Sequence, residues 1–303
     1  MSEPGGTLRG SALDLEPMIS YAGNQEDVRL RRIAHLLLSK VYVDVGAGDP
    51  VEGSVTYWLY TQGWRGVLVE PGARGAQLAA ARPEDVVLTV AVSSGGGDVL
   101  LYETAPDPGM STMRADRLAE VLDLGQTVTQ VRVPVVTLTE VFEGAPGPVS
   151  VLSLDVEGAE GIVLGSLDWA THRPVVVVVE AVLPWSTVST AHDFEGHLTG
   201  AAYDRVAFDG VNTYYVDSRH ELAGELASAL DYPTSILDRW RSAAMDRLEH
   251  YATSMTDQVA ALTTQLDAVT ADLASARGRA EAQDREPPGL RGSQREAAQR
   301  LGR

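Results

Sequence analysis

The sequence predicts an α/β protein with a doubly wound parallel sheet, followed by a long C-terminal helix. Three patterns carry this prediction: short runs rich in valine, helical segments between these runs, and a heptad repeat near the end of the chain. Strands that alternate with helices are typical of βαβ units and a parallel sheet. The C-terminal repeat indicates a coiled coil.

Five runs of β-branched residues, each bounded by Gly, Pro or acidic residues, are predicted strands: 41–45, 66–70, 86–92, 149–155 and 175–180. Helical patterns occupy 54–62, 72–82, 159–167 and 190–200. The valine run at 175–179 is nearly continuous, which is typical of a strand covered on both faces. The segments 204–208 and 213–216 flank a turn sequence and predict a hairpin.

The chain has 303 residues, which allows about two domains. Residues 1–17 carry Gly, Pro and Ser without apolar periodicity, so we expect a flexible leader. The α/β domain is predicted over 18–220, and a helical connector over 221–244. A coiled coil is predicted over 245–278, and Gly278 is the first of the Gly and Pro residues that end it. A polar tail is predicted over 279–303.

The predicted coiled coil contains a narrow seam of apolar residues at alternating spacings of three and four. Its members are Met245, Leu248, Ala252, Met255, Val259, Leu262, Leu266, Val269, Leu273 and Ala276. One interpretation is an amphipathic helix that packs on its own domain. The sustained, narrow seam favours a second one, a homo-oligomer held together through residues 245–276. Few charges flank the seam, so oligomer number and helix orientation stay open.

Composition and charge exclude several classes of function. Lys and Arg total 24 against 42 Asp and Glu, a net charge of −18 that repels phosphate backbones and anionic lipids. We therefore expect no nucleic acid as a partner. The longest apolar run, 175–183, is far shorter than the ~20 residues of a membrane helix, so no membrane span is expected. The chain has no cysteine, which excludes disulfides and thiolate chemistry. No secretory signal pattern is present in the first residues, so a cytoplasmic location is expected.

A glycine turn follows the first predicted strand, where Asp44 is succeeded by Gly46, Ala47 and Gly48. A dinucleotide fingerprint would need a third glycine where the chain has Val51, and no P-loop lysine is present. The second strand ends at Glu70, a residue type that binds ribose hydroxyls at this place in open α/β sheets. A glycine turn and a terminal acid without a pyrophosphate motif favour S-adenosylmethionine, a nucleoside without phosphate.

These residues extend into a pattern that resembles the FkbM-type methyltransferase family over about residues 18–217. The matching elements include YVDVGAGDP from Tyr42, GWRGVLVEP from Gly63, LDVEGAE from Leu154 and DGVN from Asp209. The resemblance implies a Rossmann-like class I methyltransferase sheet and transfer of a methyl group from S-adenosylmethionine to a hydroxyl oxygen, on sugars or natural-product scaffolds. The heptad segment lies outside this resemblance.

The resemblance also implies roles for individual residues. Asp44, Gly46, Ala47 and Gly48 would border the methionine part of the cofactor, and Ser54 would cap the following helix nearby. Glu70 would bind the ribose. The apolar pair Ala91 and Val92 would border adenine, although the residues alone favour an ordinary core position for both.

Three acids at strand ends are the candidate catalytic residues. Asp155 and Glu157 end the fourth predicted strand, and Glu180 ends the fifth beside it. They are candidates for a proton acceptor or for oxygen ligands of Mg²⁺, and the sequence leaves the metal open. The dipole of the following helix offers Glu157 a purely structural role. His192 is a rival base, since its ordinary pKa suits proton removal near neutrality.

The sequence therefore predicts an S-adenosylmethionine-dependent O-methyltransferase that acts on a hydroxyl of a sugar, glycan or natural-product scaffold. The alternative is a methyltransferase fold without turnover, which acts as a scaffold through its coiled coil. A third possibility, a nicotinamide-dependent oxidoreductase, is disfavoured by Val51.

Overall fold

The computed structural model describes residues 17–284, which divide into two units that meet between Ala243 and Ala244. The first unit is built on a seven-stranded sheet with the strand order β10-β11-β9-β8-β2-β3-β4. The strands are β2 (Val41–Val45), β3 (Arg65–Val69), β4 (Val86–Leu88), β8 (Val151–Leu154), β9 (Val176–Glu180), β10 (Tyr203–Phe208) and β11 (Asn212–Asp217). Neighbouring strands from β9 to β4 run parallel, and β11 is antiparallel to both of its neighbours. The prediction of an α/β fold is confirmed.

The valine-rich strands form the centre of this sheet because both of their faces are covered. Val177 and Val179 of β9 pack into one apolar cluster, and Val176 and Val178 pack into another on the opposite face. All four are essentially inaccessible to solvent, as the continuous apolar run predicts. The predicted hairpin is also confirmed as β10 and β11.

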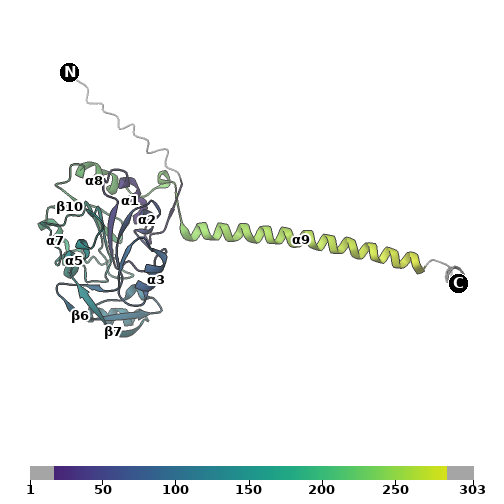
Figure 1. Cartoon of the computed structure of the whole chain (residues 1–303), viewed down its shortest axis with the longest axis horizontal. Helices are drawn as coiled ribbons and strands as arrows, with labels where there is room; N and C mark the ends of the chain where they lie inside the picture. The colour runs from purple at the N-terminus through teal and green to yellow at the C-terminus, as the bar shows by residue number, and fades with distance from the viewer. Residues whose placement is uncertain (1–16, 285–303) are drawn as a thin grey trace, which may run out of the picture. The chain divides into compact units, whose positions relative to one another are not determined.

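Helices form a layer on each face of the sheet (Figure 1). On one face, the buried leucines of α1 (Glu26–Ala34), α2 (Tyr57–Thr61), α3 (Arg74–Ala81) and α8 (Ala223–Asp231) share a cluster with Val176 and Val178. On the other face, α5 (Leu138–Glu143), α6 (Glu160–Leu164) and α7 (Glu195–Gly200) pack against Val177 and Val179. The apolar face of each of these short helices therefore packs against one side of the sheet.

A second sheet departs from the sequence-based expectation. The run 86–92, expected to be one strand, is divided between β4 in the main sheet and β5 (Ala91–Val92) in a three-stranded sheet. In this smaller sheet β5 pairs with β7 (Thr127–Val136), which forms a long antiparallel pair with β6 (Gly97–Ala105). Between β6 and β7 lie η1 (Pro108–Met110), η2 (Ala115–Arg117) and α4 (Leu118–Asp123). The chain thus leaves the main sheet after β4.

Within residues 221–244, where the sequence predicts a helical connector, lie α8, η4 (Ile236–Asp238) and β12 (Trp240–Ser242). Leu226 and Leu230 of α8 are fully buried in the core of the first unit. Beyond η4, the strand β12 pairs in parallel with β1 (Met18–Ser20). The α/β unit therefore includes these residues. The leader and the polar tail lie outside the described residues, apart from residue 17 and residues 279–284.

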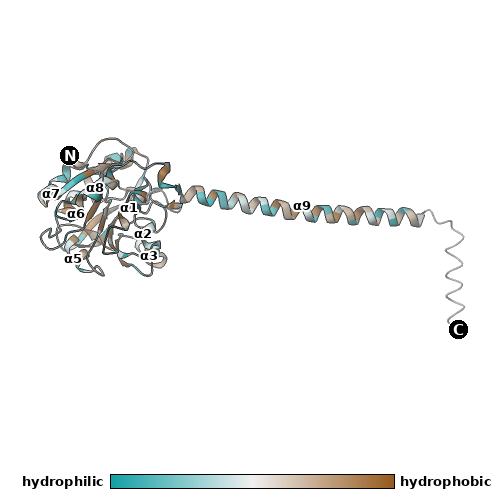
Figure 2. Cartoon of the chain, turned by 90° about the horizontal axis from the view of Figure 1, so that it is seen from above, coloured by the Kyte–Doolittle hydropathy of each residue, from teal (hydrophilic) through white to brown (hydrophobic). Residues whose placement is uncertain are grey.

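The second unit contains the helix α9 (Ala243–Asp284), 42 residues long. Its large seam residues, from Met245 to Leu273, are between 39% and 66% exposed. Apolar and polar residues alternate along the helix (Figure 2). The helix continues through Gly278 to Asp284, six residues beyond the coiled coil predicted over 245–278. An interior glycine costs only about 1 kcal/mol in a helix, too little to end one of this length.

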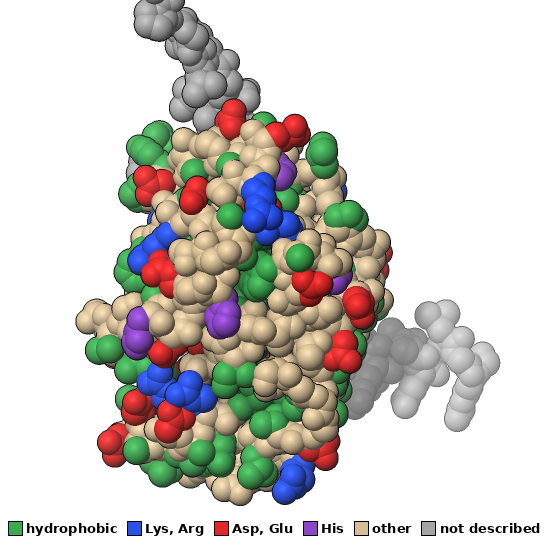
Figure 3. All heavy atoms as spheres, turned by 90° about the vertical axis from the view of Figure 1, so that its left-hand side faces the viewer, with side chains coloured by type: hydrophobic (Ala, Val, Ile, Leu, Met, Phe, Trp, Pro, Cys, Tyr) green, Lys and Arg blue, Asp and Glu red, His purple; other side chains and the backbone are tan. Residues whose placement is uncertain are grey.

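No helix within residues 17–284 is both long and apolar enough to cross a membrane. On the face drawn in Figure 3, acidic, basic and apolar side chains of the described residues are interspersed, so this face presents no continuous basic surface.

Candidate functional site

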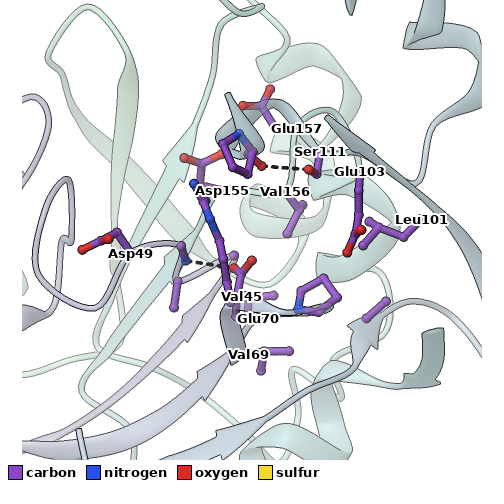
Figure 4. Close-up of a pocket in the computed structure, with 18 of the residues that line it drawn as sticks. Val45, Asp49, Val69, Glu70, Leu101, Glu103, Ser111, Asp155, Val156 and Glu157 are labelled. Carbon is purple, nitrogen blue, oxygen red and sulfur yellow. Dashed lines mark hydrogen bonds between the residues drawn. The ribbon is translucent and has the colours of Figure 1, made fainter. Parts of the chain in front are cut away.

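A pocket of about 740 Å³ opens at the carboxyl ends of β2, β3 and β8. Parallel strands of an open sheet bind ligands at this edge. Figure 4 shows the pocket with the side chains of Glu70, Glu103 and Asp155 around it. Residues of the small sheet, including Leu101, complete its wall.

The glycine turn after β2 brings the backbone against the end of β8. Gly46 has φ of 81° and Gly48 has φ of 61°, a region that favours glycine. The amides of Gly46 and Ala47 donate to the Val69 carbonyl at 2.9 and 3.2 Å. A Cβ atom on Gly46 would lie 1.7 Å from the Asp155 carbonyl oxygen. The turn therefore requires glycine for its dihedral angles and for this close approach.

Glu70 lies beside this turn, at the end of β3. Its Oε2 accepts a hydrogen bond from the Gly48 amide at 2.9 Å. Burial raises the pKa of its carboxyl, and the hydrogen bond from Gly48 acts against this rise. No hydrogen bond to Oε1 is found among residues 17–284, which leaves one carboxylate oxygen for a ligand.

The apolar part of the pocket is formed by Val90, Ala91 and Val92 together with Leu101 and Met113. Ala91 and Val92 were expected in the binding site, and both line the pocket. Leu101 and Met113 were not expected, because no strand or loop at the pocket was predicted around them. The alternation of Val and polar residues in 127–136 is the signal that could have identified the small sheet.

Asp44 and Ser54 do not line the pocket, in contrast to the other predicted cofactor residues. The Thr56 hydroxyl donates to Asp44 at 2.7 Å, and the Arg82 guanidinium donates to Ser54 at 2.5 Å. Thr56 precedes α2, and no side chain caps this helix, so the predicted cap by Ser54 is wrong. Arg82 is fully buried, and it holds both residues in a polar network behind the turn because a buried guanidinium needs partners.

The three predicted acids come together at one end of the pocket. Asp155 follows β8, Glu157 adopts a left-handed backbone with φ of 52°, and Glu180 ends β9. One carboxylate oxygen of each lies within 4.8 Å of the other two. Asp155 and Glu157 line the main pocket, whereas Glu180 lines a smaller adjoining cavity that Glu157 shares.

Burial raises the pKa of each of these acids. Repulsion from Asp155 adds to the rise at Glu157 and Glu180, whereas at Asp155 the added repulsion comes first from Glu160. The Asp155 carboxyl is open to the pocket but lies deep in its wall, where protein replaces bulk water. One oxygen of Asp155 and one of Glu180 lie within 4.8 Å of each other, and two carboxyl groups this close avoid repulsion when one of them carries a proton. The trio therefore retains a proton at a pH where ordinary carboxyls are ionised.

Neighbouring residues hold the Glu157 loop in place. The Thr112 hydroxyl donates to the Glu157 carbonyl at 2.8 Å, and Arg114 donates to the Gly158 carbonyl at 2.9 Å. Glu160 accepts from the amides of Val156 and Gly158, which gives this acid a structural role at the start of α6. The rival base His192 has a side chain that is 77% exposed and lines neither cavity.

Comparison with known proteins identifies one family. The model of the methyltransferase FkbM domain matches residues 44–204, more than half of the chain. This range contains the glycine turn, Glu70 and the acidic trio. No curated protein and no solved structure shows significant similarity to the chain.

Proposed function

Because this chain belongs to the FkbM methyltransferase family, we propose that it is an S-adenosylmethionine-dependent O-methyltransferase. Its acceptor would be a hydroxyl of a sugar, glycan or natural-product scaffold. The observation that carries the proposal is one pocket in which the glycine turn and Glu70 lie beside Asp155 and Glu157, with Glu180 within 4.8 Å of both in the adjoining cavity. The strand order and the two helical layers support a Rossmann-like, doubly wound sheet of the class I kind.

The lining of the pocket suits a nucleoside without phosphate. The oxygen of Glu70 that is not bonded to Gly48 is available to a ribose hydroxyl. Ala91, Val92 and Leu101 offer apolar contact to a flat base. Arg74 is the single basic residue among the described lining residues, alongside six acidic ones, so a pyrophosphate would be repelled. We infer that Gly46, Ala47 and Gly48 border the methionine part.

The bound cofactor would supply an activated methyl group on a sulfonium ion. The acceptor oxygen must lose its proton as it attacks this methyl group, and a base whose pKa is near the working pH does this best. Burial raises the pKa of Asp155 into that range and raises the pKa of Glu180 beyond it. We assign the proton acceptor to this pair, with Glu157 beside it orienting the acceptor.

Binding of Mg²⁺ by Asp155, Glu157 and Glu180 is the second interpretation of the trio. Carboxylate oxygens are the ligands that this ion prefers, and their proximity permits a shared ion. An ion would lower the pKa of an acceptor hydroxyl and replace the protein base. Sensitivity to a chelator separates these two interpretations.

The experiment that tests the proposal is calorimetric binding of S-adenosylmethionine or its demethylated product to the full chain. Glu70→Ala should weaken binding by about 2 kcal/mol, or about 30-fold, because a charge-assisted contact to the ribose is lost. The matched control is Glu143→Ala, an exposed residue at the end of α5, which should bind as the wild type does. Absence of binding to wild type, or unchanged affinity in Glu70→Ala, would contradict the proposal.

The exposed seam of α9 favours a second candidate function. A fold without turnover could act as a scaffold that assembles through Met245 to Leu273, which are all partly exposed. We propose that this seam joins copies of the chain in either case. A chain that assembles but never binds the cofactor would support the scaffold over the enzyme.

A further inference from the structure

Glu103 interrupts an otherwise apolar face of β6. Leu101 and Glu103 lie two residues apart, so they share one face of the strand, and both line the main pocket. Leu101 belongs to a buried apolar cluster with Ala91 and Val133. Glu103 therefore places a carboxylate in the pocket wall, on a face of β6 that is otherwise apolar.

The Glu103 carboxylate has space but no protein partner. No hydrogen bond or ion pair to it is found in the part of the chain from 17 to 284, although the residue is half-buried. It lies over Gly72, where an added Cβ atom would be 2.2 Å from Glu103 Oε1. A carboxylate withdrawn from water without a partner is costly, which favours a role toward a ligand.

Position along the pocket indicates which part of the ligand Glu103 meets. In Figure 4, Glu70 lies between Asp49 on one side and Glu103 with Leu101 on the other. Glu70 and Glu103 line the same pocket, and Gly72, over which Glu103 lies, follows Glu70 by two residues. With the ribose on Glu70 and the methyl group near Asp155, the base extends toward the apolar wall and Glu103.

We propose that Glu103 accepts a hydrogen bond from the exocyclic amino group of adenine and makes the site specific for adenosine over inosine. This inference rests on the proposed function. An ionised carboxylate only accepts hydrogen bonds, and the 6-amino group of adenine donates them. Hypoxanthine has a carbonyl oxygen at this position. The Glu103 carboxylate oxygen and this carbonyl oxygen both accept hydrogen bonds, so neither would have a donor.

The test compares two ligands by calorimetry with the full-length chain: S-adenosylhomocysteine and its 6-oxo analogue, in which hypoxanthine replaces adenine. Wild type should bind the adenine compound about ten- to a hundred-fold more tightly, the range for a hydrogen bond to a charged group. Equal binding of both compounds would overturn the inference while leaving the proposed function intact. Binding of neither would contradict the proposed function itself.

Glu103→Gln gives the assay a second arm. Glutamine has nearly the same shape, and its amide can donate to the 6-oxo group, so the preference should shrink to a few-fold or reverse. Glu143→Gln, an exposed residue outside both cavities, should retain the wild-type ratio. A Glu103→Gln variant that melts like wild type and keeps the full adenine preference would overturn the inference.

Discussion

Asp155 and Glu180 show how strongly the fold changes the chemistry of single residues. As isolated side chains they are ordinary acids, but burial and the repulsion of neighbouring carboxylates raise the pKa of both. Their proximity favours a proton on one of them, with Glu157 adding a third carboxylate within 4.8 Å. Carboxyls with perturbed pKa values that line a pocket are typical of functional sites, where burial and neighbouring charges tune the proton affinity.

The first prediction at this scale concerns turnover. Asp155→Asn and Glu180→Gln should each lower methyl transfer by at least about 100-fold, the usual contribution of a general base. Cofactor affinity should change by less than about threefold, because neither residue is proposed to bind the ribose or the base. Transfer of a labelled methyl group to a panel of hydroxylated acceptors, measured beside calorimetry, checks both parts.

Full activity in both variants would remove these acids from the mechanism. The same assay in the presence of EDTA separates the base from the metal. Unchanged rates would favour a protein base, whereas loss of activity that Mg²⁺ restores would favour a bound ion.

The second prediction concerns stability against pH. A carboxyl with a raised pKa in the folded state binds its proton more tightly there than in the unfolded chain. The stabilisation that this proton provides is complete below the pKa of the unfolded chain, about 4. It is lost as the pH rises through the pKa of the folded state, so the free energy of unfolding falls. Glu180→Gln carries a permanent donor toward Asp155 and should flatten this fall.

Urea denaturation of wild type and Glu180→Gln at several pH values between 5 and 8 measures this difference. The variant should gain stability relative to wild type as the pH rises. Parallel pH profiles for the two proteins would show that the trio is not responsible for the pH dependence.

At the scale of elements, the ends of β2, β3 and β8 are joined by backbone contacts rather than side chains. The Asp155 amide donates to the Val45 carbonyl at 3.0 Å, and Gly46 donates to Val69. These bonds align three strand ends and place Glu70 and Asp155 on one pocket. The glycine turn is therefore part of the sheet as well as a border of the site.

We expect Gly46→Ala to be far more damaging than Gly63→Ala, although both glycines have φ of 81°. Nothing lies within 4 Å of an added Cβ at Gly63, so only the backbone cost of about 1–2 kcal/mol applies there. At Gly46 the new atom collides with the Asp155 backbone, which adds about 1–3 kcal/mol and displaces the strand end. Chemical denaturation measures both, and equal losses would contradict the proposed close approach.

At the scale of the whole molecule, the exposed seam of α9 predicts assembly. Long helices that expose an apolar stripe are normally stabilised by a partner. Leu262→Glu combined with Leu266→Glu should dissociate the assembly, because two charges would enter its core. Thr264→Glu, on the opposite side of the helix, should not. Light scattering reads the mass, and an unchanged mass in the double variant would exclude the seam.

A truncated chain tests whether the chemistry resides in the first unit. Ending the chain at Ala243 preserves β12 and should yield a smaller species that still binds the cofactor. Ending it at Arg239 removes Trp240–Ser242, the partner of β1, and should lower the melting temperature. Equal melting temperatures for the two truncations would show that this strand pair adds no stability.

The sequence by itself determined the central strands, the glycine turn and the acids that end each strand. The apolar composition of Val41–Val45 and of β9 predicts that both strands lie in the centre of the sheet, because such runs are typical of strands covered on both faces. A parallel sheet brings the carboxyl ends of its strands to one edge, so Glu70, Asp155 and Glu180 could be placed together without a structure.

Only the tertiary structure decided which polar side chains face the pocket. Asp44 and Ser54 sit beside the glycine turn in sequence, yet Arg82 binds Ser54 directly and Asp44 through Thr56, on the far side of the turn. Glu103 reaches the pocket because β6 pairs with β7 across 21 intervening residues. Sequence patterns predict which residues are buried. They do not predict which distant residue forms the hydrogen bonds that a buried charge needs, because tertiary packing determines that partner.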